Sequence, residues 1–294
     1  MAITNQNQAV RYYAPEYLGM FQTIFQVNTA FSRAMAPLQT LDGVKNNTKM
    51  FSVKTNNQPV VVHDKYDTEV DGGSGATSRF GAETEVVYED QDVEYDYTLA
   101  INEKLDNFTV NEDMSNAIAD RLKLQLEAQV KKANVKTGAY ITSATPAANK
   151  STLASVDAAG VAAAFDDVSV KLAEIDVDSE IVTAYVSPVV YNIIVKDPAT
   201  TIEKHSAADI DAGTVVEYMG IKIEKTASKY LGDKVAIDIV PDGTILPFIG
   251  HQVTRTLSVN ENFDGVRLQS AAKGGTFMLD DNKAALFQFA SSAE

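Results

Sequence analysis

Residues 71–83, DGGSGATSRFGAE, have the glycine-rich composition of loops that bind phosphate groups. Such loops connect a strand to a helix whose N-terminus faces the anion, and P-loops add a lysine. Here a predicted strand follows instead, the lysine is missing, and the flanking residues are acidic. The carboxylates that would repel a phosphate are Glu83, Glu85, Glu89, Asp90, Asp92, Glu94 and Asp96. The glycines are therefore interpreted as the tip of a loop.

The same carboxylates could bind calcium or act as the acid and base of a hydrolase. Calcium loops need oxygen ligands that converge from a tight turn, whereas a strand spreads them out. A hydrolase needs one carboxyl group in an apolar pocket that raises its pKa. These acids lie on a predicted exposed strand face, and no motif marks a nucleophile. A solvated strand face is the preferred interpretation.

Metal and thiol chemistry have few candidates in this sequence. The 294 residues contain no cysteine and only three scattered histidines, His63, His205 and His251. A catalytic zinc site usually takes two or three closely spaced ligands. We therefore assign no catalytic, cofactor-binding or metal-binding residue, and we expect no enzymatic activity and no cofactor.

The elements around the glycine stretch are more informative. Strands are predicted at 48–62 and 85–103, and apolar residues of the second alternate with polar or small ones: Val93, Tyr95, Tyr97, Leu99 and Ile101. The simplest construction is one long β-hairpin, and about 15 residues per strand reach roughly 50 Å. Because two-stranded ribbons are marginally stable in water, the hairpin needs a surface, either its own body or a neighbouring subunit.

The N-terminal region begins with a polar arm and continues into a helix predicted between Pro15 and Pro37. Its apolar stripe consists of Tyr17, Phe21, Ile24, Phe31 and Met35. Membrane-surface helices usually carry many basic residues, but this helix has only Arg33, so we expect the stripe to pack against protein. Residues 1–62 carry a balance of +3, which leaves −18 for the rest of a chain whose net charge is −15. This asymmetry indicates either two differently exposed surfaces or ordinary scatter, and the net charge argues against a general nucleic-acid binder.

Two helices and a loop are predicted next. The first helix covers 111–134, with capping-box spacing between Thr109 and Glu112 and an apolar side formed by Met114, Ile118, Leu122 and Leu124. Residues 134–152, NVKTGAYITSATPAANKST, are predicted to be a loop. The second helix, near 156–175, has a stripe formed by Val161, Phe165, Val168, Leu172 and Ile175.

The remainder alternates between strands and helices. EIVTAYVS reads as a buried strand, and SPVVYNIIVKDP as a helix capped by Ser187 with Pro188 at its first position. GTVVEYMGIKIEK predicts two short strands hinged at Gly220, and KVAIDIVP predicts another. Strands at 251–258, 264–272 and 284–290 complete a β-rich end. The fold class is therefore α+β.

Membrane and secretory features are not seen. No segment approaches the ~20 apolar residues of a membrane span, and the start lacks a basic region followed by an apolar block. We therefore expect the protein to be made and used in a cytoplasm, without a membrane partner.

The order of these elements resembles the major capsid protein of tailed bacteriophages, whose Hong Kong 97-type fold encapsulins share. The resemblance covers nearly the whole chain. It is most specific in IVTAYVSPVVYNIIVKDP, followed after a loop by VVEYMGIKIEKT. In that family a strand ending in Ser-Pro or Asn-Pro starts a short helix, and a later Gly-Ile or Gly-Leu separates strands.

The resemblance implies a division into five parts. Residues 1–46 would be an N-terminal arm that ties subunits together, and 47–106 an extended loop, a long β-hairpin, lying across the neighbouring subunit. Residues 107–150 and 245–294 would form the peripheral domain with its spine helix and returning strands. Residues 151–244 would be the α/β axial domain, which meets its copies around five-fold and six-fold axes.

Some family members join subunits by a lysine–asparagine isopeptide bond that a buried glutamate assists. Lys65 in the hairpin tip and Asn262 before Phe263 resemble the reactive pair. However, GVRLQSAAKGG, which follows, contains no acidic residue where the glutamate is expected. We therefore expect no covalent crosslinking.

The resemblance implies a structural head protein that self-assembles into an icosahedral shell around viral DNA, with an encapsulin-type nanocompartment as the alternative. A hydrolase or a monomeric β-rich binding module is a further hypothesis. Implied partners are the chain itself, in pentamers and hexamers, scaffolding and portal proteins, and double-stranded DNA bound non-specifically on the inner face. The implied location is the virion, after assembly in the host cytoplasm. Fold alone does not identify the contents of the shell.

Overall fold

The structure is a computed structural model that describes residues 11–12, 24, 29–40, 49–56, 60–64, 66, 79–110, 114–197, 208–209, 214–215, 217–259 and 264–291. The chain divides into two compact units, one of residues 1–44 and 96–294 and one of residues 45–95. Each unit is described by itself. Among the described residues, no helix combines the length and the apolar character that a bilayer span requires.

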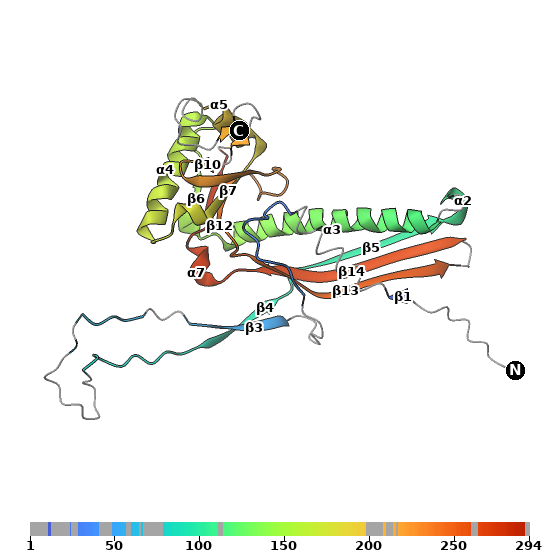
Figure 1. Cartoon of the computed structure of the whole chain (residues 1–294), viewed down its shortest axis with the longest axis horizontal. Helices are drawn as coiled ribbons and strands as arrows, with labels where there is room; N and C mark the ends of the chain where they lie inside the picture. Colours follow the sequence, from blue (N-terminus) through green and yellow to red (C-terminus); the bar gives the residue numbers. More distant parts are fainter. Residues whose placement is uncertain are drawn as a thin grey trace. The chain divides into compact units, whose positions relative to one another are not determined.

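A six-stranded sheet forms one layer of the larger unit (Figure 1). Its strands, in spatial order, are β10 (Glu217–Tyr218), β11 (Ile221–Lys225), β7 (Val182–Val186), β12 (Val235–Pro241), β15 (Phe287–Ala290) and β6 (Lys150–Thr152). β7 is parallel to β11 and antiparallel to β12. Every residue of β7 and of β12 is buried, as their continuous apolar sequences predict.

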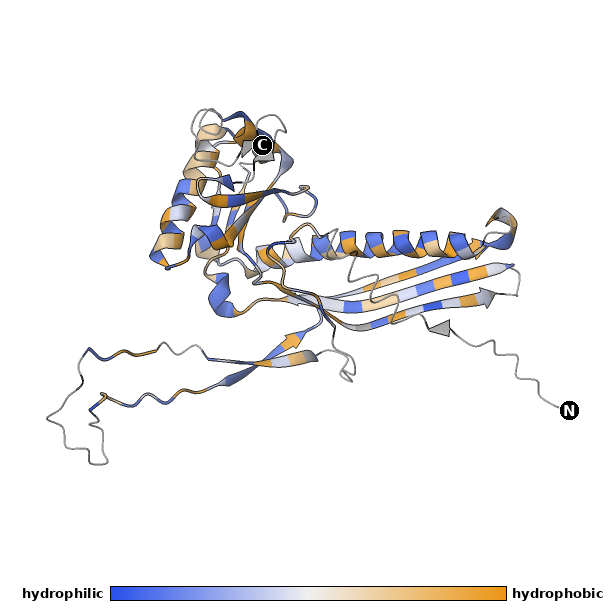
Figure 2. Ribbon diagram, viewed as in Figure 1, coloured by the Kyte–Doolittle hydropathy of each residue, from blue (hydrophilic) through white to orange (hydrophobic). Residues whose placement is uncertain are grey.

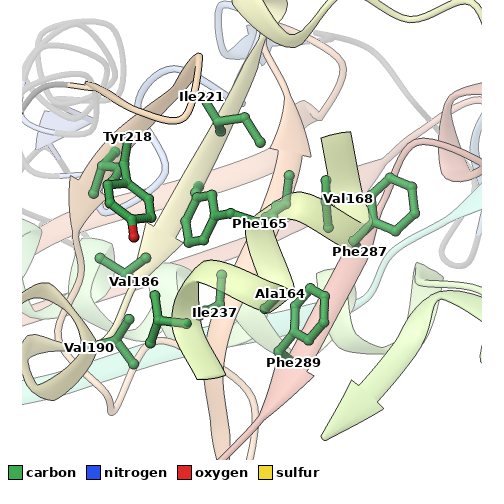
Figure 3. Close-up of a cluster of buried hydrophobic side chains, with 14 of the residues drawn as sticks. Ala164, Phe165, Val168, Val186, Val190, Tyr218, Ile221, Ile237, Phe287 and Phe289 are labelled. Atoms are coloured by element: carbon green, nitrogen blue, oxygen red, sulfur yellow. The ribbon is translucent and has the colours of Figure 1, made fainter. Parts of the chain in front are cut away.

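Two helices, α4 (Ala158–Glu174) and α5 (Pro188–Lys196), bury their apolar stripes in one cluster with this sheet (Figure 3). Phe165 of α4 meets Tyr218 of β10 edge-on, with ring centroids 5.2 Å apart. The predicted α4 stripe is confirmed except for Ile175, which follows the helix and is 40% exposed. Ser187 caps α5 as predicted, because its Oγ accepts a hydrogen bond from the Val190 N–H at 3.5 Å.

The other part of this unit consists of the long helix α3 (Met114–Ala144) and a mainly antiparallel sheet (Figure 1). The sheet strands are β1 (Arg11–Tyr12), β13 (Leu246–Val259), β14 (Gly265–Phe277) and β5 (Tyr97–Asp106), and the short β2 (Gln39–Thr40) also pairs with β13. Leu126, Val130 and Ala133 of α3 contact Ile249 of β13. The shorter elements of this unit are α2 (Asn107–Val110), η1 (Ala147–Asn149), η2 (Ser179–Ile181), β8 (Ala208–Asp209), β9 (Thr214–Val215) and α7 (Asp280–Lys283).

The helix prediction for 111–134 was wrong at its C-terminal end, and its first residues, 111–113, lie outside the described residues. α3 begins at Met114 and continues to Ala144, through much of the predicted loop. Thr109 does not cap α3, because it lies in α2. Its hydroxyl donates a hydrogen bond to the Asp106 carbonyl oxygen at 3.0 Å. Glu112, the other residue of the predicted capping box, lies outside the described residues. The predicted apolar side was right only in part, because Leu122 packs against the cluster of Leu126 and Val130 whereas Leu124 is 52% exposed.

Tertiary contacts explain why weak helix formers extend α3. The Asn134 side chain accepts hydrogen bonds from Thr29 Oγ1 and the Ala30 N–H, at 3.1 and 3.2 Å. At Gly138 the Tyr230 carbonyl oxygen comes so close that an added Cβ would lie 1.7 Å from it. These contacts outweigh a local propensity of less than about 1 kcal/mol per residue.

The smaller unit contains a two-stranded antiparallel ribbon of β3 (Lys49–Thr55) and β4 (Glu89–Glu94), with Thr55 opposite Glu89. The predicted long hairpin is therefore confirmed only in part. Residues 97–106, which were predicted to continue it, form β5 and pair with β14 in the larger unit. The smaller unit ends at Tyr95, not at residue 106 as the extended-loop boundary predicted.

Candidate assembly surfaces

The glycine stretch does not lead into a helix. Residues 67–78 lie outside the described part of the chain, and residues 83–88 continue without regular structure into β4. At the described end, Gly81 has φ +94°, and a Cβ there would lie 2.4 Å from Cδ2 of the His63 ring. Gly81 thus allows the two limbs of the hairpin to approach closely. A connection between strands, as the sequence predicted, fits this arrangement.

The acidic run of β4 is partly neutralised across the ribbon. Asp92 pairs with Lys49 and accepts a hydrogen bond from Ser52 Oγ at 2.6 Å, and Asp90 lies 3.7 Å from the Lys54 ammonium. The Lys49 and Ser52 hydrogen bonds hold the pKa of Asp92 below its usual value. No group of three metal-ligating side chains occurs in the described part of the chain. His63 is exposed, His205 lies outside the described residues, and His251 is in β13.

The limbs of the hairpin beyond the ribbon carry an unusual number of exposed apolar side chains. They are Val60, Val61, Val62, Tyr66, Phe80, Val86, Val87 and Tyr88, each at least 50% exposed. Tyr66 and Phe80 meet edge-on with centroids 5.0 Å apart. We call these eight residues the hairpin apolar surface. A concentration of this kind marks an interaction site.

Sequence reasoning overlooked the six valine and tyrosine residues outside the tip. The sequence feature that could have predicted them is the two runs of consecutive apolar residues, Val60–Val62 and Val86–Tyr88. Three consecutive apolar residues in extended backbone point alternately to both faces, so one face of a ribbon cannot bury them all.

The N-terminal region contributes a segment, residues 29–40, to the core of the larger unit. Phe31 and Ala34 are fully buried, and the Phe31 ring meets Tyr185 of β7 edge-on at 5.0 Å. The Ala34 N–H donates to Tyr185 Oη at 2.8 Å. The predicted helix was wrong here, since residues 30–34 form a turn and Met35 bridges to Ile245. Ile24 is helical, and the other residues between 13 and 28 lie outside the described chain.

A charged network fixes α3 on the sheet. Glu103 of β5 receives two hydrogen bonds from Arg121, both at 2.7 Å, and one from Gln125 Nε2 at 2.7 Å. The Arg121 guanidinium is the main reason why the pKa of Glu103 lies below its usual value. Fork-to-fork pairs of this kind orient side chains as well as attract them.

Asp238 is a buried acid that the sequence reasoning did not single out. It is fully buried in β12, where Oδ1 accepts a hydrogen bond from Gln288 Nε2 at 2.7 Å. Its Oδ2 has no hydrogen-bond partner among the described residues. Burial raises the pKa of Asp238 to about 7. The sequence feature that could have predicted this buried acid is a single aspartate inside the apolar run VAIDIVP.

The residues that resemble an isopeptide pair, Lys65 and Asn262, lie outside the described part of the chain. The strand after Asn262 is described, as β14, and its residues Gly265–Phe277 include no carboxylate. The expectation that no crosslink forms remains a prediction.

No protein-family model matches the chain, and no curated protein sequence matches it. Solved structures do. A chain of the bacteriophage PhiM1 mature capsid is 12% identical, with 91% of this chain and 88% of that chain covered and a TM-score of 0.65. A chain of the cyanophage P-SCSP1u capsid is 10% identical, with 100% of this chain and 93% of that chain covered and a TM-score of 0.67. A chain of a virus-like particle from Pyrococcus furiosus is 14% identical, with 94% of this chain and 98% of that chain covered and a TM-score of 0.53. The predicted fold is thereby confirmed: the chain has the α+β, Hong Kong 97-type fold of these shells.

Proposed function

We propose that this chain is the major capsid protein of a tailed bacteriophage, which self-assembles through pentamers and hexamers into an icosahedral shell enclosing viral DNA. The observation that carries the proposal is the match to phage capsid chains over nearly the whole length of both partners. The role is structural rather than enzymatic. The protein belongs to the virion and is assembled in the host cytoplasm.

The hairpin apolar surface supplies the physical reason for assembly. Burying one of its large side chains contributes about 1.5–3 kcal/mol, and each subunit brings eight. We propose that the hairpin of residues 47–95 lies across the neighbouring subunit and that Tyr66 and Phe80 contact that neighbour. Many such contacts add up in a closed shell.

The other parts keep their proposed roles, with one boundary moved. Residues 1–46 form the arm, and 151–244 the axial domain that meets its copies around the symmetry axes. The peripheral domain combines 107–150 and 245–294 with residues 97–106, because β5 pairs with β14. Scaffolding and portal proteins are proposed partners during assembly, and double-stranded DNA is the proposed content.

An encapsulin-type nanocompartment is the second candidate. The observation that favours it is the match to the virus-like particle from Pyrococcus furiosus, which covers 98% of that chain. The two candidates differ in what the shell contains.

Sedimentation and negative-stain microscopy of the purified chain test the proposal. We expect closed shells, or capsomers when no scaffold is present. A monodisperse monomer at high concentration would contradict it. Nuclease-protected nucleic acid in particles from infected cells would favour the capsid, and a protein cargo without nucleic acid would favour the nanocompartment.

A further inference from the structure

Hydrophilic and hydrophobic residues alternate in short bands along the long helix α3 (Figure 2). Its buried face includes polar residues, and Gln125, Gln129 and Asn134 each bond to a neighbouring element. Its solvent face carries three exposed lysines, Lys131, Lys132 and Lys136, whereas the exposed Lys123 lies half a turn around the axis from Lys132. We call Lys131, Lys132 and Lys136 the α3 lysine row.

The α3 lysine row is not engaged in ion pairs. None of its three ammonium groups pairs with a described residue, although the chain carries a net charge of −15. Many other described lysines are engaged, in ion pairs or over aromatic rings: Lys49, Lys54, Lys171, Lys222, Lys225, Lys229 and Lys283. Unneutralised lysines are thus gathered on one helix of an acidic protein, which indicates an anionic partner.

The spacing of the row suits a phosphate backbone. The three lysines lie within about 8 Å of one another along the helix axis at ~1.5 Å per residue. Ala128 and Ala139, both exposed, are the short side chains beside them and allow a bulky polyanion to come close. Lysine ammonium groups bind phosphates as point charges, without a fixed geometry, and therefore do not require a particular base sequence.

Two alternatives fit less well. On the opposite face of the β13–β14–β5 sheet, Arg255 donates to Gln269 at 2.8 Å and Lys104 also has a partner, so these two cations are less available than the α3 lysine row. An acidic protein helix would need a continuous apolar stripe on α3. The exposed Leu124 and Val135 are instead about 16 Å apart along the axis, with lysines between them.

We propose that the α3 lysine row meets the phosphate backbone of the packaged duplex, so that the solvent face of α3 is the lumenal face of the shell. This inference rests on the proposed capsid function and adds to it the surface that contacts DNA.

The test uses the unassembled full-length chain and a fluorescent duplex of about 30 base pairs and mixed sequence, with affinity measured from about 50 to 200 mM salt. The variant Lys131→Gln/Lys132→Gln/Lys136→Gln is compared with the equally charged control Lys150→Gln/Lys196→Gln/Lys229→Gln. If each row lysine meets a phosphate, the salt slope should fall by about 3 and low-salt affinity by at least about tenfold, while the control stays close to wild type. Closed wild-type shells should not bind the external duplex.

Several results would overturn the inference. One is a wild-type salt slope in the triple variant. Another is a loss of duplex affinity in the control that equals the loss in the triple variant, which would indicate a general charge effect. A variant that binds the duplex normally but no longer forms shells would assign the row to a protein contact. Normal assembly of the row variant, seen by microscopy, keeps the capsid function intact whatever the DNA result. If circular dichroism shows that the variant is unfolded, Lys131→Arg/Lys132→Arg/Lys136→Arg is measured in its place. Because arginine keeps the charge, this variant should keep the wild-type salt slope, and a reduced slope would contradict the inference.

Discussion

Replacing Asp238 with asparagine should stabilise the protein at alkaline pH and change little at acidic pH. Asp238 is fully buried, and the Gln288 Nε2 that donates to it also donates to Thr142 of α3 at 3.0 Å. An asparagine Oδ1 can accept the same hydrogen bond. The second polar atom lacks a partner in the amide, as it does in the neutral acid, so this penalty cancels in the comparison.

The magnitude follows from the pKa, which burial raises from 3.8 to about 7. Because the folded-state value lies above the unfolded one, the folded protein disfavours the charged form. The contribution of Asp238 to the free energy of unfolding is therefore fully present below about pH 4. It is lost progressively as the pH rises through about 7. Three units of pKa at about 1.4 kcal/mol each give a loss on the order of 4 kcal/mol above pH 8.

Thermal melting of the unassembled chain measures this difference at pH 4.5, about 0.7 unit above the ordinary pKa of 3.8, and at pH 8.5, about 1.5 units above the raised one. We expect Asp238→Asn to melt about 5–10 °C above wild type at the higher pH and close to it at the lower pH. The control Asp233→Asn, at an exposed position, should not show this pH-dependent gain. A variant that is equally or less stable than wild type at pH 8.5 would refute the reasoning.

Three other predictions concern the hairpin, the core and the shell. Replacing residues 64–83 with an Asn-Gly turn should leave circular dichroism and melting unchanged but impair assembly in sedimentation, because Tyr66 and Phe80 are lost; normal shells in normal yield would contradict this. Phe31→Ala should lower the free energy of unfolding by about 3–5 kcal/mol in urea titrations, and a loss below about 1 kcal/mol would show that the segment 29–40 is dispensable. Mature shells should run as single chains after hot detergent, since the strand that follows Asn262, β14, carries no acid to assist Lys65; a ladder of covalent oligomers would show otherwise.

The sequence by itself determined the elements whose signals are local. The Ser187–Pro188 start of α5, the four buried residues of the α4 stripe and the hinge at Gly220, with φ +79°, follow from side chains within a few positions of one another. Caps, helical periodicity and glycine conformations have this short range.

Tertiary structure alone decided the features that depend on distant partners. The alternating pattern of residues 93–101 fits a strand in either sheet, and only pairing with β14 assigns 97–106 to the larger unit. Contacts from residues 29–30 and 230 extend α3 beyond the point where its sequence loses helix formers. Phe31 and Asp238 have neighbours from elements far along the chain, such as Tyr185 and Gln288. Local propensities differ by less than about 1 kcal/mol, whereas burial and hydrogen bonding between distant segments contribute several, so these contacts decide.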